Sequence, residues 1–241
     1  MGFAGEMIFS DPAIKPWRML KDRENCTWEV TRGGKISRLH VKRFPRIRGK
    51  SPAEIEAKGY RLLEESGIPT VTVAAWGALE DGRSFIVTED LADFLPADKA
   101  VEAGLPFERV LESTAGLAAR LHRSGLHHRD LYLCHFMVRE AVGGANEMRL
   151  IDAARVRRLP GVLTRRRWIV KDLAQFWYST LAKNITDGER EEWLRKYCAA
   201  SEIGTVESIK KSIVRKSAAI AAHDAKLRRR EPFRNISIPR G

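Results

Sequence analysis

Apolar and polar residues alternate along much of the first part of the chain, as they do in half-buried β-strands. The stretch 27–44 contains two such runs on either side of Gly33-Gly34, which is a two-residue hairpin signal. Two further runs, 70–79 and 83–91, are separated by a short polar turn. The pattern therefore predicts four strands in two pairs.

One helix is predicted between the two pairs of strands, over residues 52–66. Ser51 is suited to cap its start, Pro52 to occupy its first position, and Glu54 stands three residues after the cap. Gly67 follows where the helix is expected to end.

Helical periodicity dominates the rest of the chain. Residues 107–125 place apolar side chains on one face of a helix, and 168–181 is a very apolar segment. Thr186 begins a capping-box pattern that opens a helix through Cys198.

The pattern changes from strands to helices near residue 90. A chain of 241 residues, 44% of them hydrophobic, suits one domain or two closely packed lobes with a real core. We expect an α+β architecture with a small β-rich lobe over 1–90 and a larger α-helical lobe over 91–241.

Composition narrows the range of partners and locations. The formal net charge of +12 indicates an anionic partner: nucleic acid, a membrane face or a phosphorylated substrate. The three cysteines form no CxxC pair, which argues against a disulfide framework or a zinc site. Neither a transmembrane run nor a secretory leader is recognisable, so a cytoplasmic location is expected.

The segment 127–136, HHRDLYLCHF, carries the strongest chemical signal. Asp130 follows His-Arg in a short loop, where a carboxylate can accept the proton of a hydroxyl group. The segment resembles the HRDLxxxN catalytic loop of kinases, with His135 in place of the metal-binding Asn. As a ligand, an imidazole suits Mn²⁺ or Zn²⁺ better than Mg²⁺. Alternatively, His135 is a core histidine or a donor to a nucleotide phosphate.

Other candidates for phosphoryl transfer follow in the order found in kinases. Lys42 lies in the strand LHVKRF, which resembles the VAIK strand whose lysine holds the nucleotide phosphates. Glu54 and Glu56 can both be considered as its partner; Glu54 already has a capping task, so we favour Glu56. Asp152 follows the short apolar strand MRLI, where a kinase has a metal-binding aspartate, and Ala153-Ala154 replaces the Phe-Gly of that motif.

Together these segments resemble the bacterial lipopolysaccharide kinase family, which has the protein-kinase-like fold. HRDLYLCHF matches the family's HRDxYLCHF, LIDAARVRRLP is similar to LIDLHRVR, and RRRWIVKDLAQFWYS to RRWxVKDLAxLxYS. The resemblance extends from about residue 37 to 182. It implies transfer of the γ-phosphoryl group of ATP, with Mg²⁺ or Mn²⁺, to heptose or 3-deoxy-manno-octulosonic acid of the inner core. The alternatives are a kinase with a protein or small-molecule acceptor, and a non-catalytic kinase-fold binding module.

The resemblance also implies a role for each matching residue. Asp130 would be the catalytic base, and Lys42 and Glu56 would form the ion pair behind ATP. Asp152 and His135 would hold the metal.

Other matching residues would support the site. Glu89 to Leu91 would present hinge backbone to adenine. His128, Arg129 and Asp172 would support the catalytic loop, with Asp172 bracing it from a buried helix.

The sequence departs from kinases in the region that covers the phosphates. Residues 19–30, where a glycine-rich loop is expected, contain no glycine. Backbone amides of Arg23 to Cys26 would have to cover the phosphates, or the phosphates would be held loosely.

Basic residues are concentrated in two runs. Residues 155–171 contain seven basic side chains and no acidic one, and residues 210–230 contain eight against the single Asp224. The first run follows Asp152, on the side where an acceptor should enter. Lipid A, the inner core and the cytoplasmic leaflet are all anionic. The alternative is a solvated basic surface.

We therefore expect a peripheral enzyme at the inner face of the inner membrane. The basic residues are not interleaved with aromatic residues for base stacking, which argues against nucleic acid. Contact with the acceptor or membrane is assigned to Arg155, Arg157, Arg165, Arg166 and Arg167.

Overall fold

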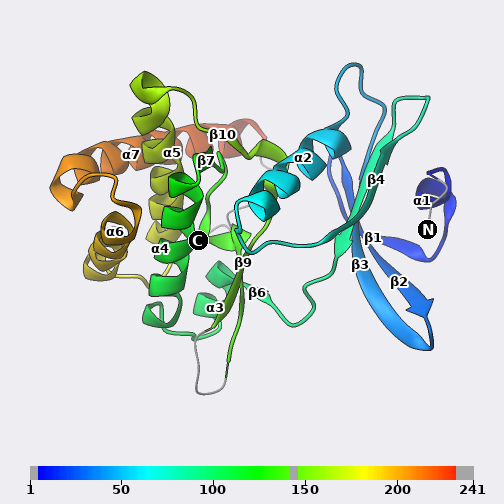
Figure 1. Ribbon diagram of the computed structural model, residues 1–241, viewed down its shortest axis with the longest axis horizontal. Helices are drawn as coiled ribbons and strands as arrows, with labels where there is room; N and C mark the ends of the chain where they lie inside the picture. The colour runs from blue at the N-terminus through cyan, green and yellow to red at the C-terminus, as the bar shows by residue number, and fades with distance from the viewer. Residues whose placement is uncertain (1–4, 142–145, 232–241) are drawn as a thin grey trace.

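The computed structural model describes residues 5–141 and 146–231 and has the predicted α+β architecture (Figure 1). A twisted antiparallel sheet forms one side of the molecule together with α1 (Met7–Ser10) and α2 (Pro52–Glu65), and a bundle of helices forms the other. The sheet has the strand order β1-β2-β3-β5-β4. Its strands are β1 (Ile14–Met19), β2 (Glu24–Arg32), β3 (Lys35–Phe44), β4 (Val73–Ala78) and β5 (Ser84–Glu89).

The predicted hairpin and helix are both present in this part. β2 and β3 pair from Glu24↔Arg43 to Arg32↔Lys35, and both glycines of the turn have positive φ. Helix α2 (Pro52–Glu65) begins at Ser51, whose hydroxyl accepts a hydrogen bond from the Glu54 amide at 3.3 Å.

The two faces of the sheet differ in character. On one face, Cys26, Val41 and Val87 are buried in a small apolar cluster that includes Ile8 of α1 (Met7–Ser10). Because side chains alternate along a strand, the neighbouring Asn25 and Lys42 point to the opposite face, toward the helical part. This alternation allows one strand to contribute both to a core and to a polar cleft.

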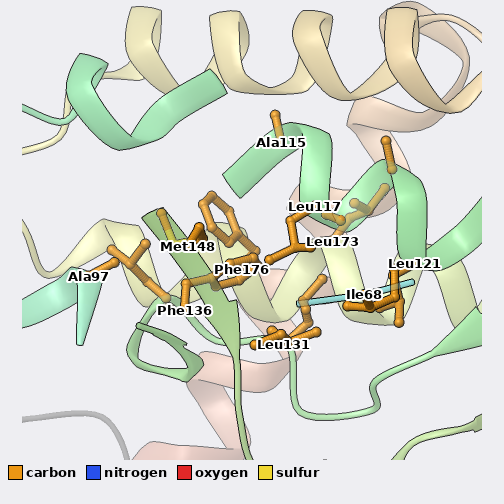
Figure 2. Packing of buried hydrophobic residues seen from close by; sticks show 14 of the residues in the cluster. Ile68, Ala97, Ala115, Leu117, Leu121, Leu131, Phe136, Met148, Leu173 and Phe176 are labelled. Atoms are coloured by element: carbon orange, nitrogen blue, oxygen red, sulfur yellow. The ribbon is translucent and has the colours of Figure 1, made fainter. Parts of the chain in front are cut away.

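The helical part contains most of the hydrophobic core. Its helices are α3 (Ala97–Glu102), α4 (Glu108–Arg123), α5 (Val162–Leu181), α6 (Asp187–Ser201) and α7 (Val206–Arg230). Leu121, Leu131, Phe136 and Phe176 are fully or almost fully buried there (Figure 2). The Phe176 ring stacks on Trp193 at a centroid distance of 3.9 Å. Fully burying one such side chain contributes about 1.5–3 kcal/mol.

Short strands and 3₁₀ turns lie in the segments that connect these helices. β6 (Leu95–Pro96), β8 (Phe136–Arg139) and β9 (Glu147–Leu150) form a small sheet, and β7 (Leu126–His127) pairs with β10 (Arg157–Arg158). The 3₁₀ turns are η1 (Leu133–His135) and η2 (Ala153–Arg155). None of the helices in the described ranges combines the length and apolar character that crossing a membrane requires.

Several observed elements were not predicted, among them β1 and α7, and α5 begins earlier than predicted. β1 contains Pro16, which weakens a strand signal, and it is an edge strand, where proline is tolerated. α7 was noted only as a basic run, although its Ile209 and Ile213 are buried. α5 begins six residues before the predicted 168, because basic residues of good helix propensity extend it.

Candidate active site

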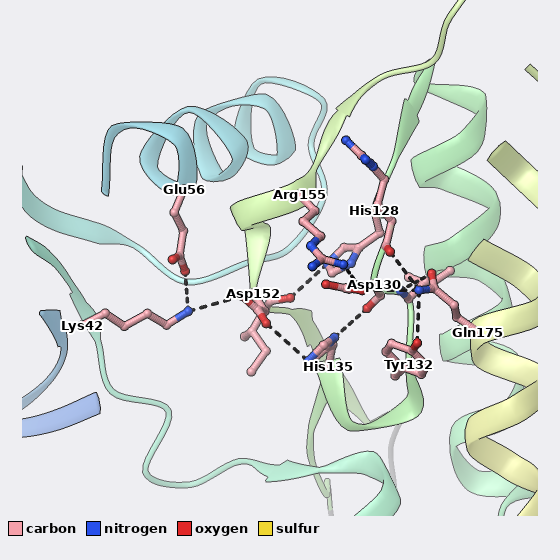
Figure 3. A network of polar contacts seen from close by, with 12 residues as sticks. Lys42, Glu56, His128, Asp130, Tyr132, His135, Asp152, Arg155 and Gln175 are labelled. Carbon is pink, nitrogen blue, oxygen red and sulfur yellow. Dashed lines mark hydrogen bonds and ion pairs between the residues drawn. The ribbon is translucent and has the colours of Figure 1, made fainter. Parts of the chain in front are cut away.

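Lys42 lies at the centre of an ion-pair cluster between the sheet and the helical part (Figure 3). Its Nζ is 2.6 Å from Glu56 Oε1 and 3.3 Å from Asp152 Oδ1. Glu56 is 1% exposed, whereas Glu54 is an exposed residue at the helix start. The structure therefore brings together Lys42 from β3, Glu56 from α2 and Asp152 from the end of β9.

The ammonium group of Lys42 and the carboxylate of Asp152 are both stabilised in their charged forms. Burial works against the ammonium of Lys42, but Asp152 and Glu56 outweigh it, so the pKa of Lys42 is raised. Burial also works against the carboxylate of Asp152, but Lys42 and His135 outweigh it, so the pKa of Asp152 is lowered. Both groups are therefore charged at neutral pH.

Asp152 is fixed by close packing of α2. It has a positive φ of 63°, and its amide donates to the Tyr60 hydroxyl at 3.2 Å. A Cβ atom added to Gly59 would lie 2.0 Å from the carbonyl oxygen of Ala153. The backbone after Asp152 thus touches the helix at a position where only glycine fits.

The loop that carries Asp130 is held by Asp172 from α5. Asp172 is fully buried and accepts hydrogen bonds from the amides of His128 at 2.6 Å and Arg129 at 2.8 Å. Burial would raise the pKa of Asp172, but these bonds and the nearby His122 outweigh it, so the pKa is lowered. The charged carboxylate also supports the positive φ of 71° at Arg129.

Two further residues of α5 hold the same loop, and the sequence did not predict them. Gln175 accepts from the Leu131 amide at 3.3 Å and donates to the Arg129 carbonyl at 2.8 Å. Ser179 accepts from the Leu133 amide at 2.8 Å. The available signal was the spacing of three polar residues, Asp172, Gln175 and Ser179, on one face of a very apolar helix.

Asp130 has one restrained oxygen and one open oxygen. Oδ1 accepts from Gln175 at 3.3 Å and from Arg155 at 3.2 Å. Oδ2 has no hydrogen-bond partner among the described residues. Asp130, Lys42 and Asp152 line one cavity of about 1300 Å³, so the open carboxylate and the ion-pair cluster face the same space.

His135 lies between Asp130 and Asp152. Its Nδ1 donates to the Asp130 carbonyl at 2.6 Å, and its Nε2 is 3.5 Å from Asp152 Oδ2. Burial disfavours a charged ring, but Cys134, Asp152 and the Asp130 carbonyl outweigh it and raise the pKa of His135 to about 10. The ring therefore carries positive charge beside Asp152.

Few side chains near Lys42 are suited to bind a divalent ion. Within residues 5–141 and 146–231, no group of three or more His, Cys, Asp or Glu side chains is arranged to bind a metal. Mg²⁺ needs only one or two protein carboxylates when phosphate oxygens and waters complete its shell. Asp152 fits that requirement, and His135 could add a ligand only through Nε2 of a neutral ring.

A second cavity of about 530 Å³ lies beside the first and extends to the segment after β5. Glu89 and Leu91 both line it. The Glu89 side chain is occupied by the Thr72 amide at 2.9 Å and Arg149 at 2.5 Å, so it braces the segment. The backbone amides of Glu89 and Asp90 donate to the carbonyls of Thr72 at 3.0 Å and Arg38 at 3.3 Å, so these two amides are occupied within the protein. A volume of this size is ordinary for a small-molecule site.

The first basic run does not form a single surface. Arg155 lines the large cavity beside Asp130, whereas three of the others bind backbone carbonyls. Arg157 donates to Val156 at 2.6 Å, Arg165 to His122 at 3.1 Å and Arg166 to Ser208 at 2.6 Å, while Arg167 is exposed.

Residues 21–197 match the model of the Lipopolysaccharide kinase (Kdo/WaaP) family. The lipopolysaccharide core heptose(I) kinase WaaP of Pseudomonas aeruginosa PAO1 is 31% identical over 76% of this chain and 76% of its own. A protein of the same name from Escherichia coli is 30% identical over 61% of this chain and 60% of its own. Helix α7 begins beyond the matched residues.

The fold also has a counterpart among solved structures. The 2.2 Å crystal structure of WbdD superposes with a TM-score of 0.51, covering 85% of this chain and 50% of that one. At 16% sequence identity this likeness concerns the fold alone.

Proposed function

The chain belongs to the Lipopolysaccharide kinase (Kdo/WaaP) family, and from this premise we propose that it transfers the γ-phosphoryl group of ATP to a sugar hydroxyl of the lipopolysaccharide inner core. The acceptor sugar is heptose or 3-deoxy-manno-octulosonic acid. The observation that supports this most directly is the shared cavity that joins the open oxygen of Asp130 to the cluster of Lys42 and Asp152.

Each residue of the cavity has a proposed task. Asp130 would orient the acceptor hydroxyl and accept its proton through Oδ2, while Gln175 and Arg155 keep Oδ1 in place. Lys42, steadied by Glu56, would bind nucleotide phosphate oxygens. Asp152 would hold Mg²⁺, and a bound Mg²⁺ neutralises charge that develops on the transferred group.

His135 would join Asp152 at the metal only as a neutral ring, through Nε2. Imidazole nitrogen suits Mn²⁺ better than Mg²⁺, whereas an amide oxygen suits Mg²⁺. We therefore expect His135→Asn to shift the ratio of Mn²⁺- to Mg²⁺-supported turnover toward Mg²⁺. An unchanged ratio would leave His135 as a positioning residue for Asp152 and the Asp130 carbonyl.

The acceptor would enter between the sheet and α7. The red end of α7 reaches toward α2 in Figure 1, and Ile220, His223, Asp224 and Arg230 line the large cavity. Tyr178 donates to Asp224 at 2.6 Å, which ties this wall to α5. Polar and charged groups of this kind suit a hydroxyl-rich, anionic sugar.

A membrane contact is proposed at the first turn of α5. Val162 is 90% and Leu163 is 100% exposed, and the exposed Arg166 and Arg167 follow in the next turn. An apolar pair beside basic groups suits the surface of an anionic leaflet, where each basic residue adds about 1 kcal/mol. We therefore propose that the enzyme binds peripherally at the inner face of the inner membrane.

Vesicle sedimentation tests that contact. Replacing both Val162 and Leu163 with Ser should reduce binding to anionic vesicles but not activity on deacylated core. Val214→Ser, an exposed valine on α7, is the matched control. Equal binding by all three proteins would exclude this turn from the membrane contact.

The decisive experiment measures ADP release from ATP, with Mg²⁺ or Mn²⁺, in the presence and absence of deacylated lipopolysaccharide core. Asp130→Asn should reduce core-dependent turnover by roughly 10²- to 10⁴-fold and leave ATP binding intact. Mass spectrometry and ³¹P NMR of the core would identify the modified sugar. Bound ATP without core-dependent release would redirect the search to a protein or small-molecule acceptor.

A further inference from the structure

The β1–β2 hairpin lies where kinases carry a glycine-rich loop over the phosphates, before the strand of the phosphate-binding lysine. Its turn is closed by a hydrogen bond from the Leu20 amide to the Arg23 carbonyl at 2.8 Å. Residues 24–26 lie within β2, between β1 and β3. Their amides are therefore committed to the sheet, which leaves little support for the expectation that amides of Arg23 to Cys26 cover the phosphates.

Side chains of the hairpin point into the cavity instead. Arg18 pairs with Asn25 across β1 and β2, and Asn25 pairs with Lys42 across β2 and β3. Directly paired residues of antiparallel strands have their side chains on the same face. Arg18, Asn25 and Lys42 thus form one row across three strands, and all three line the 530 Å³ cavity.

A bulge in β1 aims Arg18 into this row. Pro16 pairs with Cys26 and Arg18 pairs with Asn25, so Trp17 is an extra residue between the two pairs. Bulges re-aim side chains and are frequent next to binding sites. Trp17 also lines the cavity.

Arg18 and Asn25 lack the partners that buried polar groups normally have. The Asn25 side-chain oxygen and the Arg18 Nε are both buried, and neither has a hydrogen-bond partner within residues 5–141 and 146–231. Buried polar groups without a partner are uncommon in native structures, and a missing ligand is one explanation.

Arg18 differs from the other arginines whose Nε is buried. Arg43 pairs with Glu24, Arg190 with Asp187, and Arg129 stacks on Trp168. Arg18 has no hydrogen bond, ion pair or ring contact with any described residue.

Electrostatics at this position favour an anion. The Arg18 pKa is lowered by burial and by the neighbouring charge of Arg23. Arg23 lines both cavities, and among the described residues its only ion-pair partner is the adjacent, exposed Asp22. A phosphate group between the Arg18 and Arg23 guanidinium groups would offset both the burial of Arg18 and the repulsion between the two positive charges. Arginine binds phosphate through paired hydrogen bonds.

We propose that Arg18, Arg23 and Asn25 bind the phosphate groups of the nucleotide, so that side chains of this hairpin replace the backbone amides of a glycine-rich loop. Arg18 and Asn25 face the phosphates from the sheet beside Lys42, and Arg23 closes over them from the turn. The inference rests on ATP being the phosphoryl donor, as proposed above.

Calorimetric titration of the full-length protein with ATP, ADP and adenosine tests the inference. Arg18→Gln and Arg23→Gln should each weaken ATP binding by roughly 10- to 100-fold, the value expected for a hydrogen bond to a charged group. Adenosine affinity should not change. Lys15→Gln is the matched control, since it removes the same charge from an exposed position of β1 that lines neither cavity.

The outcomes separate this inference from the proposed function. If both variants bind ATP as tightly as the wild type, the proposed phosphate role of these arginines is wrong. The kinase proposal would still stand in that case, because the wild type binds ATP. Equal losses for ATP and adenosine would mean that the arginines shape the pocket, which also overturns the inference. Failure of the wild type to bind ATP would overturn both proposals.

A conservative variant guards against an effect of misfolding. Arg18→Lys keeps the charge but loses the planar fork, so it should restore part of the ATP affinity that Arg18→Gln loses. Ligand-free melting temperatures of these variants should match the wild type. No recovery in a correctly folded Arg18→Lys would show that charge at this position does not contribute.

Discussion

The catalytic loop and the β1–β2 hairpin face the same cleft but are held in opposite ways. Asp172, Gln175 and Ser179 bind backbone groups of the loop, so its shape is fixed by the protein itself. In the hairpin, Arg18 and Asn25 point into the cleft, and the Arg18 Nε and the Asn25 side-chain oxygen have no hydrogen-bond partner in the described part of the chain. The groups proposed for chemistry are therefore preorganised, whereas the groups proposed for nucleotide binding would be completed by the ligand.

The largest expected effect is on the loop. Asp172→Ala leaves the His128 and Arg129 amides unpaired in a buried place and should lower the free energy of unfolding by about 3–5 kcal/mol. Urea denaturation measures this without any ligand. As a control, Asp187→Ala should lower the free energy of unfolding by less than about 1 kcal/mol, because the Asp187 side chain is 87% exposed. Similar losses in the two variants would contradict a loop preorganised by Asp172.

The hairpin should show its contribution only when nucleotide is present. At 100 times the dissociation constant, ATP should add about 2.7 kcal/mol to the free energy of unfolding. Arg18→Gln should lose most of this gain while its ligand-free stability remains unchanged. Hydrogen exchange should show ATP-dependent protection in β1 and β2 and little change at Leu131 and Leu133. Protection that rises equally in both regions would remove the contrast between them.

An intermediate effect is expected where α2 contacts the segment after Asp152. Gly59→Ala forces a methyl group against the Ala153 carbonyl and should cost about 1–3 kcal/mol while reducing turnover. Gly116→Ala in α4 has open space around its added Cβ and should be stabilising by about 0.5–1 kcal/mol. If Gly59→Ala and Gly116→Ala changed the free energy of unfolding equally, α2 and the Ala153 carbonyl would move apart easily to admit a methyl group.

The smallest expected effect concerns the wall formed by α7. Tyr178→Phe removes the hydrogen bond to Asp224 and should cost about 0.5–1.5 kcal/mol. Because this wall lines the acceptor side, KM for the core should rise while KM for ATP stays constant. An equal rise in both constants would argue that α7 does not act on the acceptor alone.

Local sequence patterns were sufficient for the fold class, the family and several of the residues that lie around the cleft. Lys42 and Asp152 each follow from a few neighbouring residues, and Glu56 was preferred over Glu54 because the latter had a capping task. Such arguments need only the period of an element and the chemistry of its ends.

Other features depend on tertiary contacts that a linear pattern does not carry. Whether Gln175 and Ser179 bind a loop depends on which face of α5 meets that loop. Arg18 was missed because Pro16 weakens the strand signal and the bulge shifts the alternation on which a prediction relies. In the first basic run, the spacing of arginines could not reveal that Arg165 and Arg166 bind backbone carbonyls.

The contact between Gly59 and Ala153 also bears on the design of inhibitors. In protein kinases, the packing of the Phe of the Asp-Phe-Gly motif sets the active or inactive state. Here the corresponding residue is a fully buried alanine that packs directly on α2, so there is no aromatic ring to displace. Selective compounds should instead extend from the adenine side toward Arg18 with an acidic group, which a guanidinium group binds through paired hydrogen bonds.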